Sequence, residues 1–252
     1  MKYFLDSSVS NVLNIFKTKK TLIAFDLDGT LSPLVEDPSK AYIPNTTKCL
    51  LAKINKIKKY KIAIITGRSI SSTKLILGRL SLTIVGNHGL ESNYTKIKEK
   101  DKWKKRCLIL SNNLNDIFDK EKYFIENKKY SLSIHFIKKN QSNTRIVKLV
   151  NTIKPLLTNN ETMILGKDVV NILPSKKINK GIALNQIMRK HKLKHALFVG
   201  DDNTDESIFE LKNKNLIKIK IGVSRNSSAN FYLKEQKEIN SLLKLLNDTD
   251  LQ

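Results

Sequence analysis

The sequence of 252 residues lacks an apolar run close to the roughly 20 residues of a membrane-spanning helix, so we expect no span. Residues 1–20 also lack the long apolar centre of a signal peptide. The two cysteines, Cys49 and Cys107, lie far apart and near no pair of histidines. This spacing predicts free thiols, a reducing cytoplasmic location and no zinc site.

Acidic residues are scarce, because 23 Asp and Glu stand against 46 Lys and Arg and leave a net charge of +23. Such an excess can indicate nucleic acid or an anionic membrane surface as a partner. However, only six of the 46 are arginines, the residue whose bidentate guanidinium favours base reading and phosphate clamping. We therefore expect no nucleic acid and no membrane as partner, and an anionic small substrate explains part of the charge. A non-catalytic basic binding protein is the alternative from another class.

The stretch LIAFDLDGTLSP, Leu22–Pro33, runs four apolar residues directly into Asp26 and Asp28. Apolar residues without alternation predict a strand buried on both faces, as in a parallel sheet covered by helices. Carboxylates at the edge of a core are costly unless they are compensated, and a divalent cation is the usual compensation. The stretch therefore predicts a functional site at a strand end, with an ordinary Asp-Gly turn as the alternative.

Strand and helix patterns alternate on either side of a different middle segment. We expect an amphipathic helix within 1–20, strands over 22–25, 61–65, 82–85, 196–199 and 217–221, and helices over 45–60, 69–79, 180–192, 204–213 and 235–247. In the middle we expect helices over 99–120 and 142–158 and short strands within 130–137 and 163–173. The fold class is thus α/β, a Rossmann-like doubly wound parallel-sheet core (1–97 and 174–252) with an inserted α+β cap domain (98–173).

Polar residues follow the predicted core strands at the edge where open α/β sheets bind ligands. Acids, a hydroxyl and a lysine suit Mg²⁺-assisted phosphoryl transfer, because Mg²⁺ prefers oxygen ligands and a carboxylate can form an aspartyl-phosphate. Several of these residues also have an ordinary structural explanation. Thr66 could cap a helix, Lys180 could be a solvated surface lysine, and Asp202 and Asp205 could be charges at a helix N-terminus. The candidates are Asp26, Asp28, Thr66, Lys180, Asp201, Asp202 and Asp205.

DLDGTLSP, ITGRS, the KG of NKGIAL and GDDNTDE occur in the order of the four motifs of haloacid dehalogenase-like (HAD) phosphatases. DLDGTLSPLVEDP, GNHGLES, KYSLSIHF, LGKDVV and VGDDNTDESIF resemble the trehalose-6-phosphate phosphatases, and the resemblance spans about residues 22–212. It implies a C2-type cap and hydrolysis of trehalose 6-phosphate to trehalose and phosphate, in trehalose biosynthesis. A functional link to a trehalose-6-phosphate synthase is implied as well.

The resemblance also implies roles. Asp26 would be the nucleophile, and Asp28 the general acid and then the general base. Thr66 and Lys180 would bind the phosphoryl oxygens. The Mg²⁺ ligands would be the Asp26 side chain, the Asp28 backbone carbonyl and Asp201, supported by Asp205 or Asp202.

Sugar recognition is implied on the core side and in the cap. The residues are Gly67, Arg68, Asn87, His88 and Glu91 in the core, and Glu126, Lys128, Ser131, His135 and Asn171 in the cap. Two cap motifs depart from the family: Ile137 and Leu173 replace arginines, and Asn171 replaces a glutamate. Because these changes remove two guanidinium groups and one carboxylate, a related sugar or glycosyl phosphate remains the alternative substrate.

Overall fold

The structure is a computed structural model that describes residues 1–6, 11–92, 100–138, 142–166, 168–175 and 178–248. The chain divides into two compact units, Met1–Tyr94 with Lys180–Gln252 and Thr95–Asn179, here called the core unit and the cap unit. The first expected boundary of the insertion, between residues 97 and 98, lies outside the described residues.

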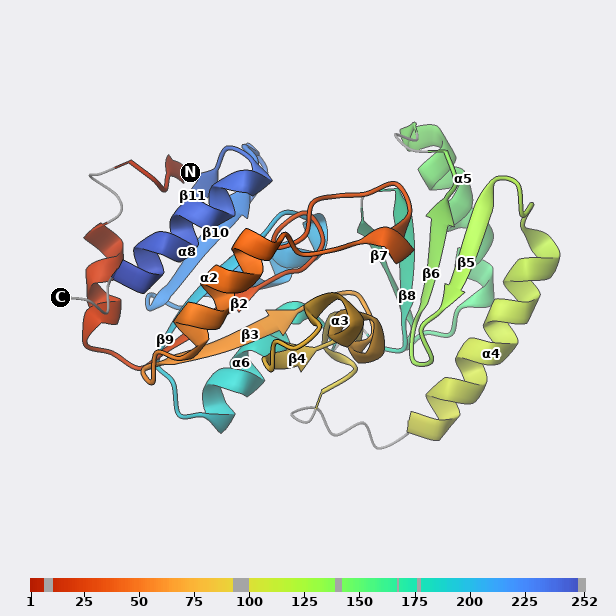
Figure 1. The fold of residues 1–252 in the computed structure, drawn as a ribbon. Helices are drawn as coiled ribbons and strands as arrows, with labels where there is room; N and C mark the ends of the chain where they lie inside the picture. Colours follow the sequence, from red (N-terminus) through yellow and green to blue (C-terminus); the bar gives the residue numbers. More distant parts are fainter. Residues whose placement is uncertain (7–10, 93–99, 139–141, 167, 176–177, 249–252) are drawn as a thin grey trace. The chain divides into compact units, whose positions relative to one another are not determined.

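The core unit is built on a seven-stranded parallel sheet in the order β1-β11-β10-β9-β2-β3-β4 (Figure 1). β2 pairs with β3 on one side and with β9 on the other, so the order of the strands reverses between β2 and β9. The expected doubly wound α/β core is therefore confirmed. The strands are β1 (Lys2–Tyr3), β2 (Thr21–Phe25), β3 (Tyr60–Ile65), β4 (Thr83–Val85), β9 (His195–Gly200), β10 (Leu216–Ile221) and β11 (Phe231–Leu233).

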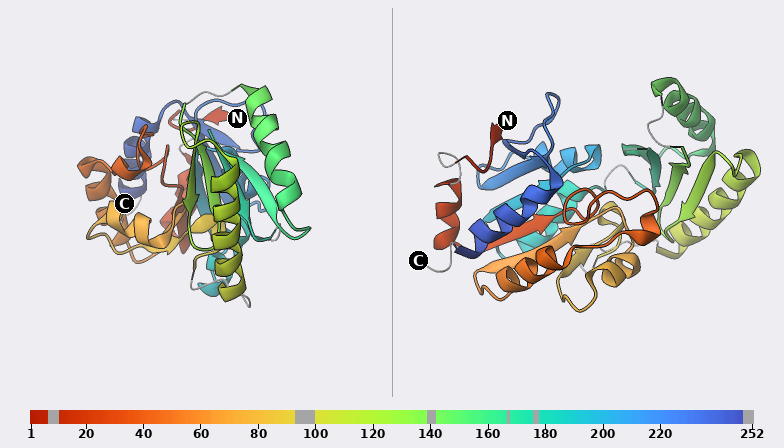
Figure 2. Two further views of the ribbon diagram at one scale, coloured as in Figure 1. Left: turned by 90° about the vertical axis from the view of Figure 1, so that its right-hand side faces the viewer. Right: turned by 45° about the horizontal axis from the view of Figure 1, so that its top comes forward.

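Alternate side chains of β2 enter two hydrophobic clusters on opposite faces of the sheet. Ile23 and Phe25 join the cluster that includes α2 (Asn45–Asn55) and α8 (Ile239–Asp248), which lie side by side (Figures 1 and 2). Leu22 and Ala24 join the cluster that includes α6 (Lys180–Lys190) and α7 (Glu206–Phe209). Burial on both faces explains the unbroken apolar run before Asp26. The other helices described in the core unit are α3 (Ile70–Leu77) and the 3₁₀ helices η1 (Asn11–Lys17), η2 (Pro38–Lys40), η3 (Asn87–Gly89), η5 (Asn203–Asp205) and η6 (Gln236–Glu238).

The cap unit is a four-stranded antiparallel sheet, β5-β6-β8-β7, with two helices on one face (Figure 1). Leu132, Ile134 and Phe136 pack in the cluster beneath the helices, whereas Ser133 and His135 alternate with them along the strand. The expected α+β insertion is confirmed. Its elements are α4 (Lys100–Ile117), β5 (Tyr123–Asn127), β6 (Leu132–Phe136), α5 (Asn143–Ile153), η4 (Lys154–Leu156), β7 (Thr162–Gly166) and β8 (Val169–Leu173). Among the helices described, none has both the length and the apolar composition to cross a bilayer.

The N-terminal segment differs from the amphipathic helix expected over residues 1–20. Lys2–Tyr3 form the edge strand β1, which pairs in parallel with Phe231 and Tyr232. Among the residues of this segment that the structure describes, 1–6 and 11–20, only Asn11–Lys17 are helical. A partner more than 200 residues away decides this pairing, and local periodicity cannot show it.

An ion pair links α4 to the turn before β7. Arg106 donates from Nε and Nη2 to the Glu161 carboxylate at 2.8 and 3.0 Å, and from Nη2 to the Leu156 carbonyl oxygen at 2.6 Å. Burial alone would raise the pKa of Glu161, but Arg106 and the Thr158 N–H outweigh it and hold that pKa below its ordinary value. The pair is therefore a stabilising contact of the cap unit.

Arg106→Ala is expected to lower the free energy of unfolding by about 3 kcal/mol, because it leaves the buried Glu161 carboxylate without its cation. Urea unfolding followed by circular dichroism measures this change. Lys105→Ala, at an exposed position of the same helix, is the control and should change stability by less than about 0.5 kcal/mol. Equal effects of the two substitutions would contradict the stabilising role of the ion pair.

Candidate active site

Three aspartates meet beyond the carboxyl ends of β2 and β9. Asp26 follows β2, Asp201 follows β9, and Asp205 ends η5. One carboxylate oxygen from each lies within 4.8 Å of the others. Because β2 and β9 are adjacent parallel strands, their ends deliver these side chains to one edge of the sheet. We call Asp26, Asp201 and Asp205 the acidic triad.

Lys180, the first residue of α6, contacts two members of the acidic triad. Its Nζ lies 3.0 Å from Asp26 Oδ1 and 2.7 Å from Asp205 Oδ1, and its side chain is only 2% exposed. Burial by itself opposes the ammonium charge, but the carboxylates of Asp205 and Asp26 outweigh it and raise the pKa of Lys180. The alternative of a solvated surface lysine is therefore wrong.

A single lysine does not neutralise the acidic triad. Burial, together with the charges of Asp205 and Asp201, raises the pKa of Asp26 well above its ordinary value, although Lys180 acts in the opposite direction. Burial and repulsion from Asp205 and Asp202 raise the pKa of Asp201 to about 7. The excess negative charge favours a further cation at this position.

The acidic triad fits a metal ion. Apart from the ion pair with Lys180, Asp26 Oδ1 is buried and receives no hydrogen bond from the described residues. Asp205 is the more constrained member, because Oδ2 accepts a hydrogen bond from the Asp202 N–H at 3.0 Å while Oδ1 contacts Lys180. The sequence leaves open whether Asp202 or Asp205 supports the metal. In the structure Asp205 belongs to the triad and Asp202 forms a capping box with it.

Two residues outside the predicted site hold Asp201 in place, and a glycine leaves room for its carboxylate. Gly29 has φ +76°, and a Cβ there would lie 2.1 Å from Asp201 Oδ2, so only glycine is compatible with this approach. Thr30 Oγ1 donates to Asp201 Oδ1 at 3.3 Å, and Lys220 Nζ donates to the Asp201 carbonyl oxygen at 3.0 Å. The signal available for Lys220 was the presence of two lysines, Lys218 and Lys220, inside the otherwise apolar strand LIKIKI.

Thr66 follows β3, the neighbour of β2, and is buried. Its hydroxyl accepts a hydrogen bond from the Arg68 N–H at 3.2 Å. The N-cap of α3 is Ser69, whose hydroxyl accepts from the Ser72 N–H at 3.2 Å. The alternative of Thr66 as the cap of this helix is therefore wrong, and the residue lies at the same sheet edge as Asp26.

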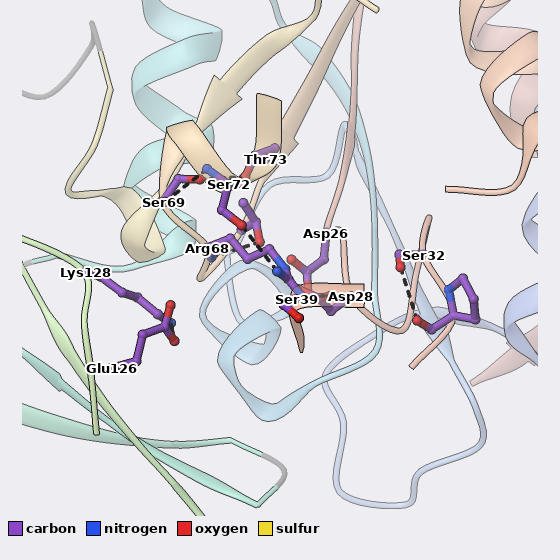
Figure 3. Close-up of polar contacts among 12 residues, drawn as sticks. Asp26, Asp28, Ser32, Ser39, Arg68, Ser69, Ser72, Thr73, Glu126 and Lys128 are labelled. Atoms are coloured by element: carbon purple, nitrogen blue, oxygen red, sulfur yellow. Dashed lines mark hydrogen bonds and ion pairs between the residues drawn. The ribbon is translucent and has the colours of Figure 1, made fainter. Parts of the chain in front are cut away.

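Asp28 is bound by an arginine (Figure 3). Arg68 donates from Nε to Asp28 Oδ2 at 2.7 Å and from Nη2 to Asp28 Oδ1 at 2.8 Å. Arg68 Nη1 donates to Ser72 Oγ at 3.3 Å. The resemblance implies a sugar contact for Arg68, but in the structure its guanidinium contacts a carboxylate of the protein.

The loop after β4 holds Asn87 and His88, both buried and both with positive φ. A Cβ on Gly67 would lie 2.6 Å from the His88 ring, so the ring packs against that glycine. Glu91 Oε2 accepts from the Ile70 N–H at 2.7 Å at the start of α3. The structure thus gathers the five core residues implied in sugar binding around the loops after β3 and β4, and it gives Glu91 a role in holding α3.

The residues implied in the cap gather on the face of the cap sheet opposite its helices. His135 Nε2 lies 2.9 Å from Glu126 Oε2. Lys128 Nζ lies 3.6 Å from the same oxygen (Figure 3). Asn171 Oδ1 accepts from Ser133 Oγ at 2.6 Å across β6 and β8. His135 thus has a carboxylate partner, and Asn171 is engaged within the sheet. Ser131, just before β6, is buried.

Comparison with known proteins agrees with this arrangement. Trehalose-phosphate phosphatase B of Arabidopsis thaliana is 27% identical over 259 residues, which cover 93% of this chain and 68% of that protein. The C-terminal domain of C. albicans trehalose-6-phosphate phosphatase matches with a TM-score of 0.76 at 22% identity, over 95% of this chain and 96% of that one. A Synechocystis sucrose-phosphatase, solved with sucrose and phosphate, matches with a TM-score of 0.59 at 18% identity, over 92% and 99%. The trehalose-phosphatase family model matches residues 24–238, a span that includes the whole acidic triad and Lys180, and the chain therefore belongs to the trehalose-phosphatase family of HAD-like phosphatases.

Proposed function

We propose that this protein is a Mg²⁺-dependent phosphatase that hydrolyses trehalose 6-phosphate to trehalose and phosphate through an aspartyl-phosphate on Asp26. The observation that carries the proposal is the buried acidic triad with Lys180 Nζ at 3.0 Å from Asp26 Oδ1. A buried carboxylate with a fixed cation beside it suits attack on a phosphate ester, because the cation offsets the charge that the two anions bring together.

The first step transfers the phosphoryl group to the protein. A carboxylate oxygen of Asp26 forms a bond to phosphorus while the bond from phosphorus to the sugar oxygen breaks. Asp28 gives its proton to the departing sugar oxygen, so the sugar leaves as a neutral alcohol. Thr66 and Lys180 bind the phosphoryl oxygens during this transfer.

The second step restores the protein. A water molecule attacks phosphorus, and the bond between phosphorus and the Asp26 oxygen breaks. Asp28, now ionised, takes a proton from that water and is ready for the next cycle. Mg²⁺ would be held by Asp26, Asp201 and the Asp28 backbone carbonyl, with Asp205 in support, and it supplies positive charge for the phosphoryl oxygens.

Trehalose as the sugar follows from family membership, with the cap unit as the proposed specificity domain. The alternative, a related sugar phosphate, is favoured by one observation: Asn171 is hydrogen-bonded to Ser133 and offers no carboxylate where the family has one. A synthase that supplies trehalose 6-phosphate is the proposed functional partner. The unpaired thiols of Cys49 and Cys107 support a reducing, cytoplasmic setting.

Phosphate release from trehalose 6-phosphate tests the proposal. We expect release with Mg²⁺, a fall of at least about 100-fold after chelation with EDTA, and recovery when Mg²⁺ is added back in excess. Failure to hydrolyse any phosphate ester with Mg²⁺ present would contradict the proposal and favour the non-catalytic binding protein.

A further inference from the structure

We propose that Arg68 is a positioning residue, whose guanidinium holds the Asp28 carboxylate in the orientation that proton transfer requires. This inference rests on the proposed function, because it concerns the acid–base step of the same site. It assigns Arg68 an action through a protein carboxylate, where the family resemblance implies contact with the sugar.

Two hydrogen bonds fix the Asp28 carboxylate. They run from Arg68 Nε to Oδ2 at 2.7 Å and from Nη2 to Oδ1 at 2.8 Å, so each oxygen receives one N–H (Figure 3). A single bond would leave the carboxylate free to rotate about its terminal torsion, whereas this bidentate pairing sets both its place and its plane. The Asp28 side chain is 34% exposed, so packing alone does not immobilise it.

Arg68 is itself anchored to elements other than the loop of Asp28. Its side chain is 15% exposed, and Nη1 donates to Ser72 Oγ of α3 at 3.3 Å. Its backbone N–H donates to Thr66 Oγ1 at 3.2 Å, and its carbonyl oxygen accepts from the Asn87 N–H at 2.8 Å. Arg68 therefore connects the loop after β2 to the loops after β3 and β4.

The chemistry of Asp28 depends on its orientation. In the first step its proton passes to the departing sugar oxygen, and in the second a proton of the attacking water passes to it. The departing sugar oxygen and the oxygen of the attacking water lie on the same side of phosphorus, opposite Asp26, because the water takes the place of the sugar. A carboxylate held in one orientation can make both proton transfers without first rotating into position.

A double-mutant cycle separates positioning from substrate binding. Arg68→Gln should lower kcat about 30-fold with little change in KM, and Asp28→Asn should lower kcat by about 10³-fold. The double variant Asp28→Asn with Arg68→Gln should match Asp28→Asn within about threefold, because the carboxylate that Arg68 orients is already absent. An equal 30-fold loss in both backgrounds, or a loss confined to KM, would overturn the proposal and favour a direct substrate contact.

Two further variants sharpen the test. Arg68→Lys keeps the charge but not the two-point contact, so it should recover less than about a third of the lost activity. Full recovery would overturn the role of the guanidinium geometry. Arg79→Gln removes an exposed arginine outside the site and should leave kcat unchanged. Melting curves verify that each variant is folded.

The cycle is run on the phosphate ester with the highest kcat/KM. Inactivity on trehalose 6-phosphate alone would overturn only the sugar assignment. A failed cycle in an enzyme that is active and loses activity on Asp26→Asn would overturn only the role of Arg68. A wild-type protein that hydrolyses no ester would overturn both.

Discussion

Asp26→Asn is expected to lower kcat for trehalose 6-phosphate by at least about 10⁴-fold, because the amide cannot form the aspartyl-phosphate. Phosphate release at saturating substrate and Mg²⁺ measures this. Glu36→Gln, at an exposed acid in the loop after the site, is the matched control and should retain full activity. Asp26→Asn activity within tenfold of the wild type would contradict the proposed nucleophile.

The same substitution should raise the melting temperature of the metal-free protein by a few degrees at pH 7. The folded pKa of Asp26 lies well above its ordinary value, so between about pH 4 and that folded value the native state holds more protons than the unfolded state. The free energy of unfolding therefore falls as pH rises through this window. The neutral side chain of Asn does not ionise, so the Asp26→Asn protein does not undergo this fall. The gain should shrink as the pH falls toward 4, because the Asp26 carboxyl group of the unfolded state then begins to take up a proton as well. Thermal unfolding in EDTA at several pH values tests this, and a lower melting temperature at pH 7 would contradict it.

Lys180→Met should lower kcat by about 10²–10³-fold and the free energy of unfolding by about 3–5 kcal/mol, because it leaves two buried carboxylates without their cation. The raised folded pKa of Lys180 means that its stabilisation is complete below about pH 10 and is lost only as pH rises through the folded value. The loss in Lys180→Met is therefore present at pH 7. The difference in stability between the wild-type protein and Lys180→Met should become smaller at acid pH, because a protonated Asp26 carries no charge for Lys180 to neutralise.

A second substitution distinguishes charge from packing in this variant. Asp26→Asn combined with Lys180→Met removes one of the two uncompensated carboxylates, so Asp26→Asn should stabilise the Lys180→Met protein more than it stabilises the wild-type protein. Urea unfolding of the four proteins of this cycle gives the coupling energy. An equal effect of Asp26→Asn in the wild-type and Lys180→Met backgrounds would show that Lys180 acts through packing and would contradict the electrostatic account.

The core of the fold follows from local pattern. Leu22–Phe25 and Ala196–Val199 are unbroken apolar runs, and such runs predict buried parallel strands whose ends deliver Asp26 and Asp201 to one edge. The alternation with helices then predicts the doubly wound order. The grouping of Asp26, Asp201 and Asp205 with Lys180 therefore follows from residue type and position at a strand or helix end.

Contacts that depend on a distant partner could not be predicted. The edge strand β1 forms because Lys2–Tyr3 pair with β11, which is itself only three residues long. Likewise, β5 forms because it pairs with β6. The Arg68–Asp28 contact joins residues 40 positions apart, and nothing in either local sequence distinguishes it from a substrate contact. The Ser133–Asn171 hydrogen bond is likewise a cross-strand pairing that depends on register.

The most direct test of the proposed function is kcat/KM for a panel of phosphate esters, measured with Mg²⁺ on the wild-type protein. The panel contains trehalose 6-phosphate, sucrose 6-phosphate, glucose 6-phosphate and p-nitrophenyl phosphate. We predict that trehalose 6-phosphate exceeds every other ester by at least about tenfold. A value for trehalose 6-phosphate no higher than that of another sugar phosphate would contradict the assignment of trehalose.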